Sequence, residues 1–306
     1  MIAVARRIGI AVLEVAVAWS HDDRSRVHVL RDGRRMLAAI PRIARELATV
    51  KPTPDLYRHA GEVFDNHQAE VLLDADASHW WFRCKGSFVA DAIRRHLGSQ
   101  DPATRLVDIG GGAGGVTAIV GWPADRLVVV DGSPLLAATA LTRHGAPALA
   151  ARVDHVPIAG GTFGVALLLD VIEHLEDPVA TLREARRILA PDGLLVVNVP
   201  AHPRLWSGAD EALGHIRRYT RPLLAQHLAA AGFELTWSSH VFSWLVVPVW
   251  LRRRTATTEQ AKLGLDENGP LIERVALVLA RLERMIAARM PLPIGTSIIA
   301  TARPRP

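Results

Sequence analysis

A glycine-rich segment beside two short apolar runs most constrains the fold of this chain. Arg105–Gly115 reads RLVDIGGGAGG, an apolar run that ends in an acid and then in glycines. Arg126–Ser133 reads RLVVVDGS and repeats the apolar run with its terminal acid. Both runs are short and rich in β-branched residues, which predicts buried strands, and Val116–Val120 predicts the start of a helix. A strand, a glycine turn, a helix and a second strand ending in Asp131 indicate half of a nucleotide-binding sheet.

The glycine turn fits two classes of ligand. It contains the G-x-G-x-x-G fingerprint of dinucleotide-binding proteins. It also contains D-x-G-x-G-x-G, the pattern of methyltransferases that use S-adenosylmethionine (SAM), at Asp108, Gly110, Gly112 and Gly114. A carboxylate at position 108 would lie where a pyrophosphate requires positive potential, and it suits a ligand with an ammonium and a sulfonium group. Asp131 suits either ligand, because its carboxylate can accept hydrogen bonds from ribose hydroxyls.

Composition limits the class of protein and its partners. The chain has 306 residues, 49% of them hydrophobic, which is enough for one large domain or one domain with a smaller companion. The net charge is +5, yet the basic residues are scattered and form no stripe with interleaved aromatics, so we expect no nucleic-acid partner. The single cysteine, Cys84, excludes an internal disulfide and a cysteine-based zinc site. We expect no metal site.

The first 54 residues are expected to form an accessory segment before the main domain. Ile8–Trp19 after two arginines has the outline of a signal peptide, but Glu14 interrupts it and it is too short to span a bilayer. A cofactor-dependent enzyme would also lack its cofactor outside the cell. We therefore expect a cytoplasmic chain. Its main domain is expected over residues 55–240.

Apolar runs and helical patterns alternate regularly along the main domain. Strands are expected at residues 105–109, 126–131, 149–153, 163–169, 194–199 and 233–240, and helices at 114–121, 134–144, 178–189 and 222–231. Pro191–Gly193 is expected to separate the third helix from the strand that follows it. The βαβ repetition predicts an α/β fold with a doubly wound parallel sheet.

The alternation fails between residues 241 and 294, which we expect to form a helical insertion or cap before a closing strand in 295–306. An amphipathic helix is expected over 271–290, with one apolar face formed by Ile272, Val275, Leu279, Leu282 and Ile286. Trp244 and Trp250 bracket an apolar segment followed by arginines. Residues 241–254 therefore fit either a peripheral membrane contact or a subdomain that covers the site.

Polar residues cluster after the apolar run that ends at Leu169. Asp170, Glu173 and His174 follow it within five residues. In an open α/β sheet, ligands lie beyond the carboxyl ends of the strands, so these groups could orient an acceptor or take its proton. They could equally cap the next helix or hydrogen-bond the loop.

The aromatic cluster HWWFR at residues 79–83 fits either a helix anchor or a pocket wall.

The motifs DIGGGAGG, VVVDGS, FGVALLLDVIEHLEDP and LAPDGLLVVNVP occur in that order and resemble class I SAM-dependent methyltransferases of the type 11/type 12 group. This resemblance covers about residues 98–240. HWWFR, LWSGADEALGHIRRYT and PIGTSIIATARP are similar to segments of a bacterial subgroup of these enzymes and extend the match to residues 57–304. The resemblance implies a Rossmann-like sheet of about seven strands whose last strand is antiparallel.

The resemblance also assigns roles to residues that hold the cofactor. Asp108, Gly110, Gly112 and Gly114 would hold the methionine end of SAM, and Asp131 would bind the ribose hydroxyls. Asp170 would lie beside the sulfonium, and Asp154 would reach the adenine amino group. This sequence departs from the family pattern at the adenine site, because Arg152 stands where the acid is customary and Asp154 lies two residues later.

On the acceptor side, His174 and His215 are the candidate bases. Glu173, Arg217, Arg218 and Tyr219 are the candidate acceptor-binding residues. These residues predict methylation of a small-molecule or lipid-like acceptor. Two alternatives remain at this point: an NAD(P)-dependent oxidoreductase, and a SAM-binding protein that has lost catalysis and serves as an assembly partner.

Overall fold

The computed structural model describes residues 79–97, 104–255 and 270–305. All of them belong to one compact unit, Ala60–Pro306. The expected accessory segment over 1–54, with the apolar run Ile8–Trp19 within it, lies outside the described residues.

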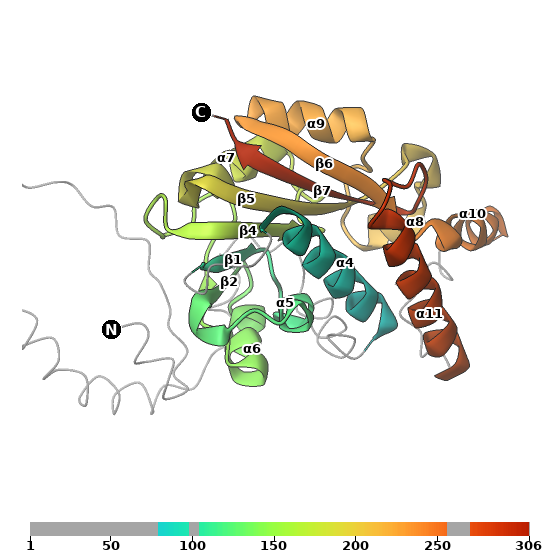
Figure 1. Cartoon of the computed structure of the whole chain (residues 1–306), viewed down its shortest axis with the longest axis horizontal. Coiled ribbons are helices and arrows are strands. Elements are labelled where there is room, and N and C mark those ends of the chain that lie inside the picture. Colours follow the sequence, from blue (N-terminus) through green and yellow to red (C-terminus); the bar gives the residue numbers. More distant parts are fainter. Residues whose placement is uncertain (1–78, 98–103, 256–269, 306) are drawn as a thin grey trace, which may run out of the picture. The chain divides into compact units, whose positions relative to one another are not determined.

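The described residues form a seven-stranded sheet in the order β3-β2-β1-β4-β5-β7-β6 (Figure 1). Its strands are β1 Leu106–Ile109, β2 Leu127–Asp131, β3 Ala148–Ala150, β4 Phe163–Leu169, β5 Leu189–Pro200, β6 Phe233–Val241 and β7 Ser297–Pro304. The first five strands run parallel to one another. The doubly wound α/β sheet expected from the sequence is confirmed.

The closing strand β7 lies inside the sheet and runs antiparallel to both neighbours. It pairs with β5 from Leu195↔Ala302 to Pro200↔Ser297. It pairs with β6 from Phe233↔Pro304 to Val241↔Ser297, so that β6 and β7 form a hairpin with the 241–294 insertion at its tip. The expected antiparallel last strand is therefore confirmed.

Helices cover both faces of the sheet (Figure 1). One face carries α7 Pro178–Ile188 and α9 Arg221–Ala230, and the other carries α4 Trp80–Leu97, α5 Gly115–Val120, α6 Pro134–His144 and α11 Pro270–Ala287. Short helices α8 Gly208–Ala212 and α10 Val246–Thr255 lie in the connections after β5 and β6.

Each sheet face has its own apolar core, because successive side chains of a strand point to opposite faces. Val107 of β1 belongs to the core cluster that also contains Leu182 of α7 and Leu224 of α9. Leu106 packs with Phe88 of α4 on the other side. The central strands are buried on both faces, which explains why they read as continuous apolar runs in the sequence.

Two expected elements differ in detail. Pro191–Gly193 was expected to lie between a helix and a strand, but α7 ends at Ile188 and β5 begins at Leu189, so these residues lie within the strand. The pairing with β4 shifts register there, between Phe163↔Leu189 and Val165↔Leu194, and this irregularity accommodates the proline. The third strand is also shorter than expected, because Arg152 and Val153 belong to the turn that follows β3.

The amphipathic helix α11 buries a different face from the one its large apolar residues suggest. Ile272, Val275, Leu282 and Ile286 are each about half exposed, at 55%, 49%, 47% and 50%. The buried positions are Ala276, Ala280, Glu283 and Ala287. Small alanine side chains let α11 approach α4 closely, and the larger apolar residues are left on the outer side of the helix.

Among the described residues, no helix has both the length and the apolar character needed to cross a membrane.

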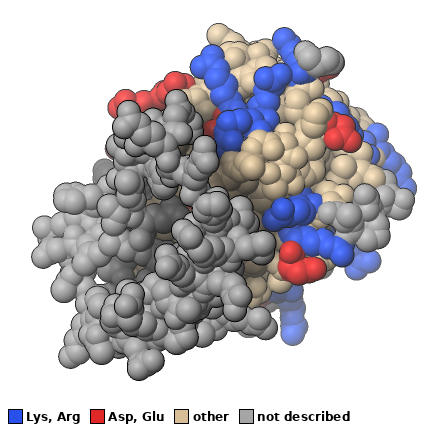
Figure 2. Space-filling view, turned by 90° about the vertical axis from the view of Figure 1, so that its left-hand side faces the viewer, with Lys and Arg blue, Asp and Glu red and all other residues tan. Residues whose placement is uncertain are grey.

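On the face shown in Figure 2, the Lys and Arg side chains of the described residues lie in separate groups among uncharged surface. The expectation that the protein binds no nucleic acid stays a prediction.

Candidate cofactor and acceptor site

The glycine turn connects β1 to α5 at the carboxyl end of the sheet. Gly110, Gly112 and Gly114 adopt positive φ angles of 73°, 57° and 82°, which side-chain-bearing residues rarely take. The N–H groups of Gly110 and Gly111 donate to the carbonyl oxygen of Val130 at 2.7 and 3.1 Å, so the turn is fastened to the end of β2. No atom lies within 4 Å of the position that a Cβ of Gly112 would occupy, and the backbone there is open to a ligand.

Asp131 ends β2 and holds the glycine turn from the other side. Its Oδ2 accepts a hydrogen bond from the N–H of Gly112 at 2.9 Å, and its Oδ1 accepts one from the N–H of Ser133 at 2.8 Å. Burial raises the pKa of this carboxyl, and the two N–H groups oppose that rise. A carboxylate oxygen has more than one lone pair, so each oxygen can still accept a ribose hydroxyl.

Asp108 lies under the glycine turn. It is 1% exposed, and its Oδ2 accepts a hydrogen bond from the hydroxyl of Thr117, which is fully buried on α5. A Cβ added at Gly111 would stand 2.6 Å from the Asp108 Cγ. Asp108 therefore links β1 to α5 through Thr117 and packs against the glycine turn at Gly111. Its contact with the methionine end of SAM stays a prediction.

Asp170 follows β4 and adopts a positive φ of 55°, unusual for a residue with a side chain. Its Oδ1 accepts a hydrogen bond from the amide of Asn198 at 2.5 Å, and its Oδ2 pairs with the ammonium of Lys85. These contacts orient the carboxylate at the carboxyl edge of the sheet. A strained backbone held by two polar partners is typical of a functional site.

Lys85 and Asn198 are the site residues that the sequence analysis missed. Lys85 is 6% exposed on α4, and its ammonium lies 5.7 Å from the centre of the Trp81 ring and 5.3 Å from that of Phe82. Trp81 in turn stacks on Phe242 at 4.2 Å between ring centres. The HWWFR cluster therefore anchors α4 and also surrounds the lysine that pairs with Asp170. The one available signal was that Lys85 is among only three lysines in the chain.

The loop after β4 brings Glu173 and His174 to the same edge. A Cβ on Gly110 would stand 2.5 Å from Val171 Cγ2, so this loop faces the glycine turn. Glu173 is fully buried, and burial together with the charge of Asp170 raises its pKa well above the usual range. Burial, reinforced by the nearby His215, lowers the pKa of His174 to about 4, and the ring is therefore neutral at pH 7.

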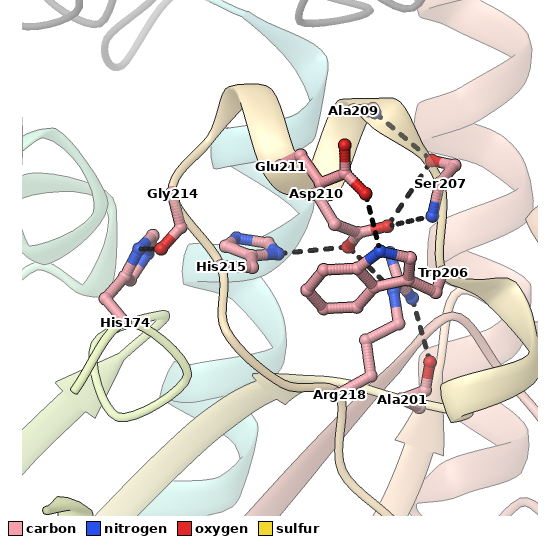
Figure 3. A network of polar contacts seen from close by, with 10 residues as sticks. All are labelled: His174, Ala201, Trp206, Ser207, Ala209, Asp210, Glu211, Gly214, His215 and Arg218. Atoms are coloured by element: carbon pink, nitrogen blue, oxygen red, sulfur yellow. Dashed lines mark hydrogen bonds and ion pairs between the residues drawn. The ribbon is translucent and has the colours of Figure 1, made fainter. Parts of the chain in front are cut away.

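His215 reaches the same place from the segment after α8 (Figure 3). Its ring centre lies 4.8 Å from that of His174, and its Nδ1 lies 3.0 Å from Oδ1 of the buried Asp210. Asp210 also accepts a hydrogen bond at 2.7 Å from Nε of Arg218, whose Nη1 donates to the carbonyl oxygen of Ala201 at 2.8 Å. This network fixes His215 in position.

The other predicted acceptor residues lie in the same segment but in different settings. Arg218 is 9% exposed and is held in the Asp210 network. Tyr219 is fully buried, and its hydroxyl donates to the carbonyl oxygen of Ile172 at 3.3 Å. Burial raises the pKa of Tyr219 to about 12. Arg217 donates from Nη2 to the carbonyl oxygen of Glu176 at 3.1 Å, which ties the two loops together.

Asp154 lies in the turn after β3, apart from these groups. Arg152 binds both of its carboxylate oxygens, with Nε to Oδ1 at 3.0 Å and Nη2 to Oδ2 at 2.7 Å. The hydrogen bonds from Arg152 hold the pKa of Asp154 below its usual value. The residue that departs from the family pattern thus contacts the predicted adenine acid directly.

A glycine turn and three acids at the carboxyl ends of neighbouring strands fit a nucleoside ligand with a cationic tail. Comparison with known families agrees: the model of the family described as "Methyltransferase domain" matches residues 81–237, more than half of the chain. The chain belongs to this methyltransferase family. It is a SAM-dependent methyltransferase, and S-adenosyl-L-methionine is its methyl donor.

Individual relatives of this methyltransferase carry related names. A probable S-adenosylmethionine-dependent methyltransferase of Mycobacterium tuberculosis H37Rv is 24% identical over 201 residues, covering 65% of this chain and 71% of the relative. A ubiquinone biosynthesis O-methyltransferase of Parvibaculum lavamentivorans is 28% identical over 176 residues, covering 48% and 70%. The solved structure of a SAM-dependent methyltransferase of Thermotoga maritima shares the fold, with a TM-score of 0.50, 17% identity and coverage of 80% and 99%.

The family match decides between the two ligands that the glycine turn allowed. The match to a methyltransferase domain favours SAM over the NAD(P) of an oxidoreductase. The open backbone at Gly112 and the carboxylate of Asp131 fit SAM. The resemblance to the narrower bacterial subgroup, carried by HWWFR and GHIRRYT, stays a prediction.

Proposed function

We propose that the methyltransferase acts on a hydroxyl group of a small-molecule or lipid-like acceptor bound over His174 and His215. The observation that carries this proposal is the meeting of the two imidazoles, with ring centres 4.8 Å apart, in the polar edge that also holds Asp170. The printed name of the P. lavamentivorans relative, an O-methyltransferase, supports the choice of oxygen.

The cofactor would be held by the residues that border the glycine turn. Asp131 would accept the ribose hydroxyls, and the open backbone from Gly110 to Gly114 would receive the methionine end. Asp108 would support that backbone from below through Thr117. Asp154 would accept the adenine amino group beside its contact with Arg152.

SAM supplies a methyl group that its sulfonium already activates. The protein therefore mainly has to align two reactants and exclude water, and good alignment alone can supply about 7–11 kcal/mol. Lys85 and Asn198 would hold Asp170 beside the sulfonium. His174 and His215 would activate the acceptor hydroxyl, the role expected of candidate bases.

The remaining predicted acceptor residues would shape the acceptor side. Glu173 would contact the acceptor region from its buried position between Asp170 and the histidines. Arg218 and Tyr219 would act by positioning, since one holds the Asp210 network and the other supports the 170–174 loop. Arg217 would bind acidic groups of the acceptor at the rim.

We also propose a division of the chain into domains. Residues 55–240 and 295–306 would form the catalytic core, and residues 241–294 would form a cap on the β6–β7 hairpin.

We place a peripheral membrane contact at residues 241–254, on the cytoplasmic side. Val247, Trp250 and Leu251 of α10 are 62%, 41% and 53% exposed, which suits a surface that meets a lipid-like acceptor. Sedimentation with lipid vesicles tests this contact, and protein that stays in the supernatant contradicts it.

An acceptor screen that detects S-adenosylhomocysteine release tests the proposed function. Hydroxylated small molecules and lipids should release S-adenosylhomocysteine in a time-dependent manner, and His215→Asn should reduce that release. Calorimetry supplies the control, because wild-type protein should bind S-adenosylhomocysteine and not NADH. Turnover with amine acceptors alone would contradict the choice of oxygen.

A further inference from the structure

Three potential metal ligands meet in the acceptor half of the site. Glu173, His174 and His215 each offer one ligand atom, and these atoms all lie within 4.8 Å of one another. Within residues 79–97, 104–255 and 270–305, this is the single group of three histidine, cysteine or acidic side chains with such spacing. The group comes from two loops that are far apart in the sequence, after β4 and after α8.

The carboxylate of Glu173 is buried without a partner. The residue is 0% exposed, and neither carboxylate oxygen receives a hydrogen bond from any other residue in the described part of the chain. Burying a carboxylate costs several kcal/mol unless a cation or hydrogen bonds compensate. The neighbouring cations are already committed: Lys85 pairs with Asp170, and Arg218 pairs with Asp210. Neither of these cations is left to compensate an ionised Glu173, and a bound metal ion would supply that positive charge.

The two histidines are held as metal-binding histidines usually are. A ligating imidazole commonly donates its second ring N–H to a carbonyl or carboxylate, which fixes the ring and its tautomer. His174 Nδ1 lies 3.2 Å from the carbonyl oxygen of Gly214, and His215 Nδ1 lies 3.0 Å from Asp210 Oδ1 (Figure 3). Both contacts are made through Nδ1, so these histidines would ligate through Nε2. Arg218 and the N–H of Ser207 hold Asp210 in turn, at 2.7 and 2.9 Å.

We propose that Glu173, His174 and His215 bind a divalent transition-metal ion of the zinc class. Imidazole and carboxylate ligands suit Zn²⁺ and its first-row neighbours better than Mg²⁺, which prefers oxygen ligands alone. Three protein ligands leave at least one coordination position open, as in catalytic zinc sites. Bonds of about 2.0–2.1 Å place ligand atoms about 3.4 Å apart, so the cluster would draw together by up to about 1.4 Å around the ion.

This inference deepens the proposed function and rests on it for the position of the acceptor. An acceptor hydroxyl oxygen would take the open coordination position, and the ion would lower the pKa of that hydroxyl. The hydroxyl proton leaves to solvent. The oxygen then forms a bond to the methyl carbon as the carbon–sulfur bond breaks, and the sulfur keeps the electron pair. In this arrangement His174 and His215 activate the acceptor hydroxyl through the ion that they hold, and not as free bases. The sequence alone led us to expect no metal here.

Calorimetric titration of the full chain, without a polyhistidine tag and after treatment with a chelator, tests the site. Zn²⁺ should bind with a stoichiometry of one, and Mn²⁺ and Co²⁺ should compete with it. Glu173→Gln and His215→Asn should each weaken Zn²⁺ binding by about tenfold or more, since each removes one of three ligands. Glu176→Gln is the matched control, because this exposed acid lies three residues from Glu173 in the same loop and should leave binding unchanged.

Binding of S-adenosylhomocysteine to each variant shows that the variant is folded and separates the two proposals. If Glu173→Gln does not fold, His174→Gln and His215→Asn carry the test. Absence of stoichiometric Zn²⁺, Mn²⁺ and Co²⁺ binding to wild-type protein that still binds S-adenosylhomocysteine overturns the metal site and leaves the methyltransferase proposal standing. Unchanged Zn²⁺ affinity in folded Glu173→Gln and His215→Asn also overturns it.

Discussion

At the scale of single residues, the site is built from buried charges that compensate one another. Lys85 neutralises Asp170, and Arg218 neutralises Asp210. Breaking such a pair leaves one uncompensated charge in the interior, which is far more costly than losing an exposed ion pair. Each charge therefore holds its partner in a defined orientation, and this rigidity would position the proposed cofactor and acceptor ends of the site.

Asp131→Ala should weaken S-adenosylhomocysteine binding by about tenfold or more. The substitution removes the predicted ribose contacts and also the two hydrogen bonds from Gly112 and Ser133, each worth about 1.5–3 kcal/mol when the acceptor is charged. Isothermal titration calorimetry measures the change. Asp125→Ala is the control, because the Asp125 side chain is 75% exposed. Equal affinity in wild type and Asp131→Ala would show that the cofactor lies elsewhere.

His240 should make stability fall as the pH is lowered from about 6.5 to about 4. Burial lowers the pKa of His240 to about 4, with Arg221 and His202 nearby, while the carbonyl of Leu292 acts against this. The unfolded state binds a proton in this window and the folded state does not, so acid favours unfolding. Urea denaturation from pH 7 to pH 4 should show a shallower loss for His240→Gln than for wild type. Parallel curves for the two proteins would contradict the assignment.

At the scale of elements, short side chains start the helices that follow the site. Ser133 accepts from the N–H of Leu136 at the start of α6, and Thr220 accepts from that of Leu223 at the start of α9. Prolines follow these caps at the first or second helical position, where a missing N–H costs nothing. These caps let each helix begin directly after a site loop.

Asp177→Ala should lower the free energy of unfolding by about 1 kcal/mol, the usual effect of losing an N-cap. The Asp177 carboxylate accepts hydrogen bonds from the N–H groups of Val179 and Ala180 at 3.0 and 3.1 Å at the start of α7. Chemical denaturation measures the difference, with Glu176→Ala as the exposed neighbour for comparison. If Glu176→Ala destabilises the protein as much as Asp177→Ala does, loss of the N-cap hydrogen bonds is not the source of the destabilisation.

At the scale of the whole molecule, the last strand completes the sheet. β7 is inserted between β5 and β6, and Ile298 and Ala300 belong to the core on the α7 and α9 side while Ile299 belongs to the other. Without β7, β5 and β6 would each expose an unpaired edge and an apolar surface. The C-terminal residues thus join the parallel half of the sheet to the hairpin that carries the 241–294 insertion.

Deletion of residues 297–306 should abolish cooperative folding, because it removes the hydrogen-bonding partner of both β5 and β6. Circular dichroism during thermal denaturation should show a sharp transition for the full chain and none for the truncated one. Removal of Pro306 alone is the matched control, since this residue follows β7 in the sequence. A truncated chain that unfolds with an unchanged midpoint would contradict this role.

The sequence by itself determined the alternation of strands and helices, the glycine turn and the acids that end β1, β2 and β4. These signals are local, because burial on both sheet faces gives continuous apolar runs and a tight turn needs glycine. Only the tertiary structure decided the partners of the buried polar groups. Lys85 reaches Asp170 across 85 positions, and His215 meets Glu173 and His174 across two loops. The tertiary structure also decided which face of α11 is buried. The alanines face α4 because the space between the two helices is limited, whatever the size of the other apolar residues.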